Sequence, residues 1–347
     1  MKVGSLAERY VIGWLETPVG KVPRISTGLT SFDKAGEVMV RLGIRRTRYM
    51  VEPGLYAVGT PNADSPILVT ANYKLSFDSL RRELGGLDAW IMVLDTKGIN
   101  VWCAAGKGTF GTEEIIKRIE LTQLAKIVNT RRLILPQLAG PGVAAHQVLA
   151  RSGFSVVYGP IRAADLPTFL KAGMKASPEM RRVRFTLRDR LVLTPMEFVG
   201  GARYLLLALG LLLALSGINP AGYSLGSIKS SGFHSAGFVL VAYLCGTIAG
   251  PLLLPYLPGR SFSTKGAFAG LIIFAALSLT RLTGNSAETI AWLFLFTTIA
   301  SFATMNFTGA STYTSLSGVK KEMRFAVPLQ VTSAVFGLFM WIVARVV

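Results

Sequence analysis

Cysteine and histidine are scarce in this chain, with two of each among 347 residues. Cys103 and Cys245 are too few for a disulfide framework, or for a four-cysteine zinc or iron–sulfur site built by one chain. Residues 1–18 hold no apolar run of signal-peptide length, so we expect no export of the first half of the chain. Any metal chemistry must therefore need few protein ligands.

Acidic residues are almost absent after residue 198, where Glu288 and Glu322 are the only two. Apolar segments dominate there, at about 199–217, 233–257, 267–282, 287–307 and 325–346. Segments of roughly 17 to 25 residues match the thickness of a bilayer, and the alternation typical of a membrane barrel is missing. We therefore expect an all-α domain of five transmembrane helices over 199–347, with little ionisable chemistry to favour transport.

Basic residues cluster just before the first apolar segment, in the linker 181–198, and basic and nearly uncharged flanks then alternate along the chain. The positive-inside rule predicts a multi-pass protein of the inner cell membrane, with residues 1–198 in the cytoplasm and the C-terminus outside. The linker can also contact anionic membrane lipid. We expect no nucleic-acid binding, because no reading motif or interleaved aromatic residues accompany the charge. Gly246 and Gly250 predict close helix packing beside a small Cys245.

Residues 1–180 are expected to form one α/β domain. Its predicted strands are 66–70, 89–94, 133–135 and 154–158, and its predicted helices are 76–84, 112–129, 143–151 and 164–172. This alternation indicates a parallel, doubly wound, Rossmann-like sheet whose ligand lies beyond the carboxyl ends of the strands. Residues 1–50 form an N-terminal extension, in which 33–44 is expected to be a strand and turn.

Gly106, Gly108 and Gly111 match the G-x-G-x-x-G pattern of dinucleotide-binding loops. That pattern should follow a strand directly, whereas ten residues separate Asp95 from Gly106. Val101 also stands where a Walker loop needs glycine. The backbone NH groups of residues 108–112 remain candidates to cradle an anionic or amide-bearing ligand.

The segment Asn100-Val-Trp-Cys-Ala-Ala-Gly-Lys107 closely resembles the cap-helix motif of the mercury-methylating corrinoid protein family, HgcA. Similar segments occur in the corrinoid domain of the corrinoid iron–sulfur protein large subunit of acetyl-CoA synthesis. Residues 65–78 and 135–146 resemble the sheet-edge loops of the same family. The resemblance is specific over residues 50–180 and architectural after 199, where the family also has five transmembrane helices.

This resemblance implies a corrinoid cofactor whose cobalt is held by its own ring, so that the protein supplies at most one axial ligand. The usual Asp-x-His-x-x-Gly histidine is missing, which leaves Cys103 as the candidate axial ligand of cobalt and the catalytic residue. A thiolate is a strong, soft donor. In an arbitrary α/β protein, however, a lone cysteine is more often a small buried hydrophobe. Trp102 either walls the ring or fills the core.

The residues expected to bind the corrinoid follow the ends of three strands. They are Thr70, Ala71, Asn72 and Tyr73, proposed for the methyl-bearing side, then Asn100, Val101, Trp102, Cys103, Ala104, Ala105, Gly106, Lys107, Gly108 and Thr109, and then Pro136, Gln137, Gly140 and Gly142.

The expected function is that of a membrane-anchored corrinoid-dependent methyltransferase that passes a methyl group from cobalt to Hg(II). The resemblance further implies a folate-type methyl donor and a ferredoxin-like partner with two [4Fe–4S] clusters. One alternative is a corrinoid methyl carrier of one-carbon, acetyl-CoA metabolism, although an N-terminal cysteine cluster and a donor-binding barrel are missing. The other is a membrane sensor, if Gly106–Gly111 binds a nucleotide.

Overall fold

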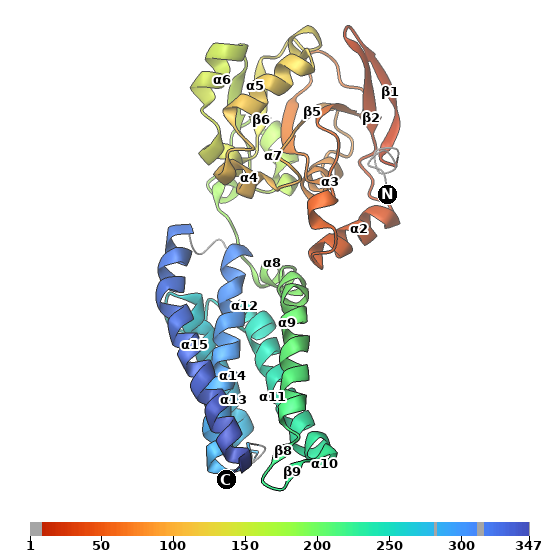
Figure 1. Ribbon diagram of the computed structural model, residues 1–347. Coiled ribbons are helices and arrows are strands. Elements are labelled where there is room, and N and C mark those ends of the chain that lie inside the picture. The colour runs from red at the N-terminus through yellow and green to blue at the C-terminus, as the bar shows by residue number, and fades with distance from the viewer. Residues whose placement is uncertain (1–8, 281–282, 311–315, 347) are drawn as a thin grey trace. The chain divides into compact units, whose positions relative to one another are not determined.

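The computed structural model describes residues 9–280, 283–310 and 316–346. These residues form two compact units. One contains the described chain up to Val183 except Arg41–Gly43, and the other contains Arg41–Gly43 and the described chain from Arg184 onward. The first unit is a sheet covered by helices, and the second is almost entirely helical (Figure 1).

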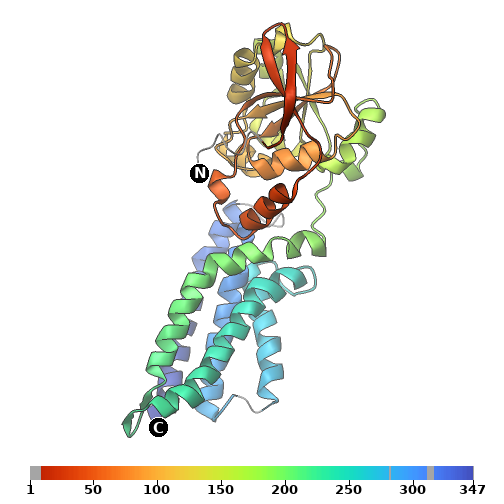
Figure 2. The same cartoon turned by 90° about the vertical axis from the view of Figure 1, so that its right-hand side faces the viewer.

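The first unit is built on a seven-stranded sheet with the order β1-β2-β3-β5-β4-β6-β7. Its strands are β1 (Val11–Thr17), β2 (Gly20–Ile25), β3 (Gly54–Val58), β4 (Ile67–Ala71), β5 (Ala89–Leu94), β6 (Arg132–Leu135) and β7 (Ser155–Tyr158). The four predicted strands are β4 to β7, and they are mutually parallel. A wholly parallel sheet was the wrong expectation, because β3 runs antiparallel to β5. Strand β2 is parallel to β3 and forms an antiparallel hairpin with β1, drawn in red in Figure 2.

Helices cover both faces of this sheet. They are α3 (Lys74–Arg82), α4 (Val101–Lys107), α5 (Thr112–Leu121), α6 (Ala145–Ser152) and α7 (Leu166–Lys171), with 3-10 turns at Arg46–Arg48, Leu124–Lys126, Gln137–Gly142, Ala163–Asp165 and Glu179–Arg181. The apolar residues of α4, α5 and α6 share one core, and those of α3 and α7 share the core on the other face. The helix expected to reach residue 129 ends at Leu121, because Gln123 adopts a left-handed backbone with φ of 47°.

The expected strand and turn at residues 33–44 is wrong, because helix α2 (Ser31–Arg41) occupies most of this segment. Two of its eleven residues, Asp33 and Val40, are buried. Its sequence is nevertheless strongly amphipathic, with the apolar residues on one face. Beside Val40, the buried residue is a charged one near the N-terminus of the helix, Asp33.

Asp33 belongs to a buried ion cluster that joins α2 to α3. Lys74 Nζ lies 2.6 Å from both Asp33 Oδ1 and Asp78 Oδ2, while Arg81 lies 2.9 Å from Asp33 and 2.7 Å from Asp78. All four residues are at most 5% exposed. Burial alone would raise the pKa of Asp33, but hydrogen bonds from Lys74 and Thr30 outweigh it and lower that pKa below its usual value. The four side chains are therefore charged in the fold, and their ion pairs hold α2 against α3.

The second unit is a helical bundle. Its helices are α8 (Leu187–Leu191), α9 (Thr194–Leu215), α10 (Leu225–Ser227), α11 (Phe233–Leu244), α12 (Gly250–Leu253), α13 (Phe262–Ser278), α14 (Ser286–Asn306) and α15 (Leu316–Val346), with π-helical turns at Ile228–Gly232 and Cys245–Ala249 and a small hairpin of β8 (Ile218–Asn219) and β9 (Gly222–Tyr223). A 3-10 turn, Phe307–Ala310, follows α14.

Four helical segments of the described chain are long and apolar enough to cross a membrane: Leu187–Leu215, Leu225–Leu253, Ser286–Asn306 and Ser317–Arg345. The third expected span, 267–282, corresponds to α13. This helix has 17 residues and is therefore shorter than the four segments above. It begins earlier than expected because the Ser261 side chain caps it by accepting a hydrogen bond from the Thr264 backbone. Residues 281–282 lie outside the described residues.

The close packing expected at Gly246 and Gly250 is confirmed. A Cβ on Gly246 would lie 2.7 Å from the carbonyl oxygen of Ala300, and one on Gly250 would lie 3.2 Å from Cβ of Thr304. Thr304 Oγ1 donates a hydrogen bond of 3.0 Å to the Gly246 carbonyl. The segments Leu225–Leu253 and Ser286–Asn306 therefore approach each other backbone to backbone, which small residues allow between membrane helices.

Candidate functional site

The structure brings the three predicted groups of site residues to one edge of the sheet. Strands β4, β5 and β6 are parallel and end at Ala71, Leu94 and Leu135. Their carboxyl ends therefore meet at the same edge, which is the usual position of a ligand site in an α/β domain. The segments that follow these ends contain Asn72, helix α4 and the turn Gln137–Gly142.

Helix α4 carries Cys103 at the boundary between core and surface. Val101, Ala104 and Ala105 are buried, since they share the face of the helix that packs on the core. Cys103 is half-buried, and Gly106 and Lys107 on the outer side are exposed. The Asn100 side chain caps the helix by accepting a hydrogen bond of 2.9 Å from the Cys103 backbone.

Trp102 is 38% exposed. The interpretation that this ring fills the core is therefore wrong. A large exposed aromatic side chain beside a partly accessible cysteine gives α4 an apolar outer surface next to its thiol.

Asn72 fixes the chain segment that leads into α4. Its Oδ1 accepts hydrogen bonds from the Thr96 backbone at 3.1 Å and from the Gly98 backbone at 3.0 Å. The Thr96 hydroxyl lies 2.8 Å from the same oxygen and 2.7 Å from the Ile99 carbonyl, and its single proton serves one of these two acceptors. Asn72 is 3% exposed, and its Nδ2 lies 3.4 Å from Asp95 Oδ1. Its neighbours Thr70, Ala71 and Tyr73 are also buried. Asn72 thus acts on α4 through the loop after β5.

Glu114 is a second anchor of this loop. Its Oε1 accepts a hydrogen bond of 2.9 Å from the Asp95 backbone, at the end of β5, and pairs with Arg118 at 2.6 Å. Burial opposes ionisation of Asp95, but hydrogen bonds from Lys97 prevail and lower its pKa. The four-residue spacing from Glu114 to Arg118 is the one sequence signal for this contact.

The turn Gln137–Gly142 packs directly on the backbone of α4. A Cβ on Gly142 would lie 2.9 Å from Cα of Ala105 and 3.0 Å from its carbonyl oxygen, so glycine permits this approach. Gln137 accepts a hydrogen bond of 2.6 Å from Arg181. Pro136 and Gly140 belong to the same segment and are half-buried.

The glycine pattern at residues 106–111 does not form a nucleotide loop. Gly106 lies in the last turn of α4, Gly108 ends that helix with φ of 78°, and Gly111 precedes α5. The backbone NH groups of Gly108, Thr109 and Phe110 all donate to carbonyl groups of α4. Three of the five NH groups expected to cradle an anion, those of residues 108–110, are therefore engaged within the chain.

The donor set suits a metal that brings most of its own ligands. Within the described residues, no group of three or more His, Cys, Asp or Glu side chains could hold a metal ion. Cys245 is buried in the helical unit, whereas Cys103 is partly accessible. A corrin supplies four nitrogen ligands to cobalt, so a single accessible thiol at α4 is compatible with that group.

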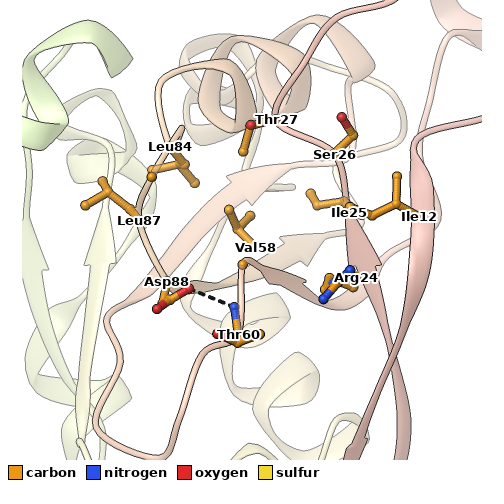
Figure 3. Close-up of a pocket in the computed structure, with 12 residues that line it drawn as sticks. Ile12, Arg24, Ile25, Ser26, Thr27, Val58, Thr60, Leu84, Leu87 and Asp88 are labelled. Atoms are coloured by element: carbon orange, nitrogen blue, oxygen red, sulfur yellow. Dashed lines mark hydrogen bonds between the residues drawn. The ribbon is translucent and has the colours of Figure 1, made fainter.

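A separate cavity of about 470 Å³ lies at the opposite edge of the sheet (Figure 3). It is lined by the ends of β2 and β3 and by residues 84–88, just before β5. Asp88 accepts a hydrogen bond of 2.7 Å from the Thr60 backbone at its rim. None of the predicted corrinoid-binding residues lines this cavity.

Part of the first unit is similar to proteins named for acetyl-CoA metabolism. Residues 37–169 match the family model of the CO dehydrogenase/acetyl-CoA synthase delta subunit. The matched segment runs from α2 to α7 and includes the whole carboxyl edge with α4.

Individual relatives agree with the delta-subunit family match. The acetyl-CoA decarbonylase/synthase complex subunit gamma of Archaeoglobus fulgidus is 32% identical over 128 residues, covering 36% of this chain and 27% of that protein. The same subunit of Methanopyrus kandleri is 34% identical over 123 residues, covering 35% of this chain and 26% of that protein. The chain thus spans about a quarter of the length of these curated relatives.

The expected methyl transfer to Hg(II), and with it the expected mercury-methylating enzyme, is contradicted by these comparisons. The relatives are named as subunits of an acetyl-CoA complex, which supports the alternative of a methyl carrier. The missing cysteine cluster and barrel had argued against that alternative.

Proposed function

We propose that this chain is a membrane-held corrinoid protein that carries methyl groups in acetyl-CoA-type one-carbon metabolism. The observation that carries the proposal is the similarity of residues 37–169 to acetyl-CoA complex subunits, over a segment that contains α4 and its partly accessible Cys103. The corrinoid would supply a cobalt that accepts and releases a methyl group.

The residues of this chain would hold and orient that cofactor. Cys103 would hold the cobalt through its sulfur, and Asn100 and Asn72 fix the helix and loop that position this sulfur. Trp102 and Lys107 would face the ring from the exposed side of α4. Thr70, Ala71 and Tyr73 would support the methyl-bearing side from the end of β4. The protein partners would be a separate iron–sulfur reductant, a methyl donor of the folate type and a subunit that accepts the methyl group.

The four long apolar segments would hold the protein in the inner cell membrane, with the α/β unit on the cytoplasmic side because the basic linker precedes the first of them. In this proposal the sheet and α4 build the corrinoid site, and the helical unit anchors it.

The test uses the full chain in lipid nanodiscs, kept free of oxygen and loaded with hydroxocobalamin. We expect wild type and Cys245→Ala to bind corrinoid and shift its visible absorption spectrum away from that of the free cofactor. Cys103→Ala should lose this shift while its far-UV circular dichroism stays unchanged, since the side chain is small. Identical cobalt spectra for Cys103→Ala and wild type would contradict the axial role.

A second measurement tests the carrier role. Loaded with a labelled methyl group, the chain should transfer it to the acetyl-CoA decarbonylase/synthase complex of a relative such as Archaeoglobus fulgidus. Transfer to Hg(II) in place of that complex would overturn the proposed function.

A further inference from the structure

The helical unit contains a cavity of about 810 Å³ between α13 and α15. Both helices pack along α14, which forms the floor. The lining residues belong to the segment 260–267 on one side, to Ser301 on the floor and to the segment 318–330 on the other side, where they are Gly318, Lys321, Glu322, Phe325, Ala326, Leu329 and Gln330. It is separate from the corrinoid site and does not depend on the proposed function.

A buried amide oxygen inside this cavity has no hydrogen-bond partner among the residues that the structure describes. Gln330 is 7% exposed, and its Nε2 donates a hydrogen bond of 2.8 Å to Ser301 Oγ. Ser301 in turn donates its only hydroxyl proton to the Ser263 carbonyl at 2.9 Å, so it must accept from Gln330. This fixes the orientation of the amide and leaves Gln330 Oε1 without a donor. A buried acceptor of this kind favours a ligand that carries a hydroxyl.

The rest of the lining combines positive charge with an apolar wall. Arg260 and Lys321 line the cavity and are exposed, so their charges are at its mouth. The one lining carboxylate, Glu322, is already engaged by the Ser263 backbone at 2.6 Å. Phe325 and Leu329 extend the surface as an apolar strip along α15.

We propose that this cavity binds one anionic phospholipid whose headgroup carries free hydroxyl groups, of the phosphatidylglycerol type. Its phosphate would lie between Arg260 and Lys321, a headgroup hydroxyl would donate to Gln330 Oε1, and an acyl chain would follow Phe325 and Leu329. Basic pockets between membrane helices are suited to such headgroups. A soluble glycerol phosphate shares the phosphate ester and the hydroxyl groups of this headgroup. The apolar strip favours the lipid over the soluble molecule, because it lies on a helix long enough to cross a bilayer.

Native mass spectrometry of the delipidated full chain in detergent tests this proposal. The chain is titrated with phosphatidylglycerol, with phosphatidylcholine of the same acyl chains and with soluble glycerol 3-phosphate. We expect one retained phosphatidylglycerol, and weaker retention of phosphatidylcholine and of the soluble phosphate. Lys321→Gln should weaken phosphatidylglycerol binding about fivefold, because one basic residue contributes about 1 kcal/mol near a lipid headgroup.

Two further variants separate the cavity from general surface charge. Gln330→Leu removes the buried acceptor and should also weaken binding about fivefold, the equivalent of one hydrogen bond. Lys320→Gln removes a neighbouring exposed charge that does not line the cavity and should leave binding unchanged. Equal effects of Lys320→Gln and Lys321→Gln, or equal binding of the two lipids, would overturn the proposal. Binding of glycerol 3-phosphate as tight as that of the lipid would assign the site to a soluble phosphate instead.

Discussion

Replacing Asn72 by alanine should loosen α4 without removing any group that faces the cofactor. The substitution deletes the acceptor of two backbone hydrogen bonds, from Thr96 and Gly98. A buried hydrogen bond contributes about 1 kcal/mol, so the local free energy of opening should fall by about 2 kcal/mol. Since 1.4 kcal/mol corresponds to a factor of ten, amide hydrogen exchange there should accelerate about thirtyfold.

The assay is hydrogen–deuterium exchange with mass spectrometry on the full chain, following the peptide that covers residues 95–107. Asn129→Ala is the matched control, because Asn129 is exposed and its one side-chain contact, to Asp64, is distant from α4. Exchange should rise in the peptide for Asn72→Ala only, and corrinoid affinity should fall with it. If exchange of residues 95–107 were the same in both variants, Asn72 would not position α4 and the reasoning would fail.

Two other predictions concern the packing and the charge of the first unit. Gly142→Ala places a Cβ 2.9 Å from Cα of Ala105, so we expect overpacking to lower the free energy of unfolding by about 1 to 3 kcal/mol and to weaken corrinoid binding. Denaturant titration measures the first effect, and titration with the corrinoid measures the second. The pKa of Asp33 is lowered in the fold, so the unfolded chain takes up its proton first as the pH falls; the stability that this carboxylate contributes should be complete above about pH 5 and decline below about pH 4. Thermal unfolding between pH 7 and pH 3 should show that decline in wild type and a smaller one in Asp33→Asn.

Local pattern was sufficient to predict the central part of the fold. Strands β4 to β7 were predicted close to their actual bounds, because each is a short apolar run between polar helical segments. Strand β3 and its direction were not predicted, since the order of strands depends on contacts between distant segments. Helix α2 was missed because Asp33 is buried against Lys74 and Arg81, and a buried acid at that position looks like a solvent-exposed one in the sequence.

The sequence pattern predicted that the three candidate segments follow strand ends, and the structure brings these segments to one edge of the sheet, but the pattern did not specify the contacts among them. The carboxyl edge and Cys103 followed from the strand pattern and the resemblance. The roles of Asn72 and Glu114 depend on hydrogen bonds to the loop after β5, which no local pattern specifies. The expected methyl transfer to Hg(II) is contradicted, because the relatives that match this part of the chain are named as subunits of an acetyl-CoA complex.

The order of the elements along the chain has a consequence for synthesis. All seven strands of the sheet precede Gly159, whereas the first long apolar segment ends at Leu215. At about 5 to 20 residues per second, the ribosome needs roughly 3 to 11 seconds to add the intervening 57 residues. The sheet and both of its covering layers can therefore assemble while the first hydrophobic helix is still being made. A variant that slows assembly of the sheet, such as one in the ion cluster of Lys74, would expose unpaired strands during the interval in which the ribosome is recruited to the membrane.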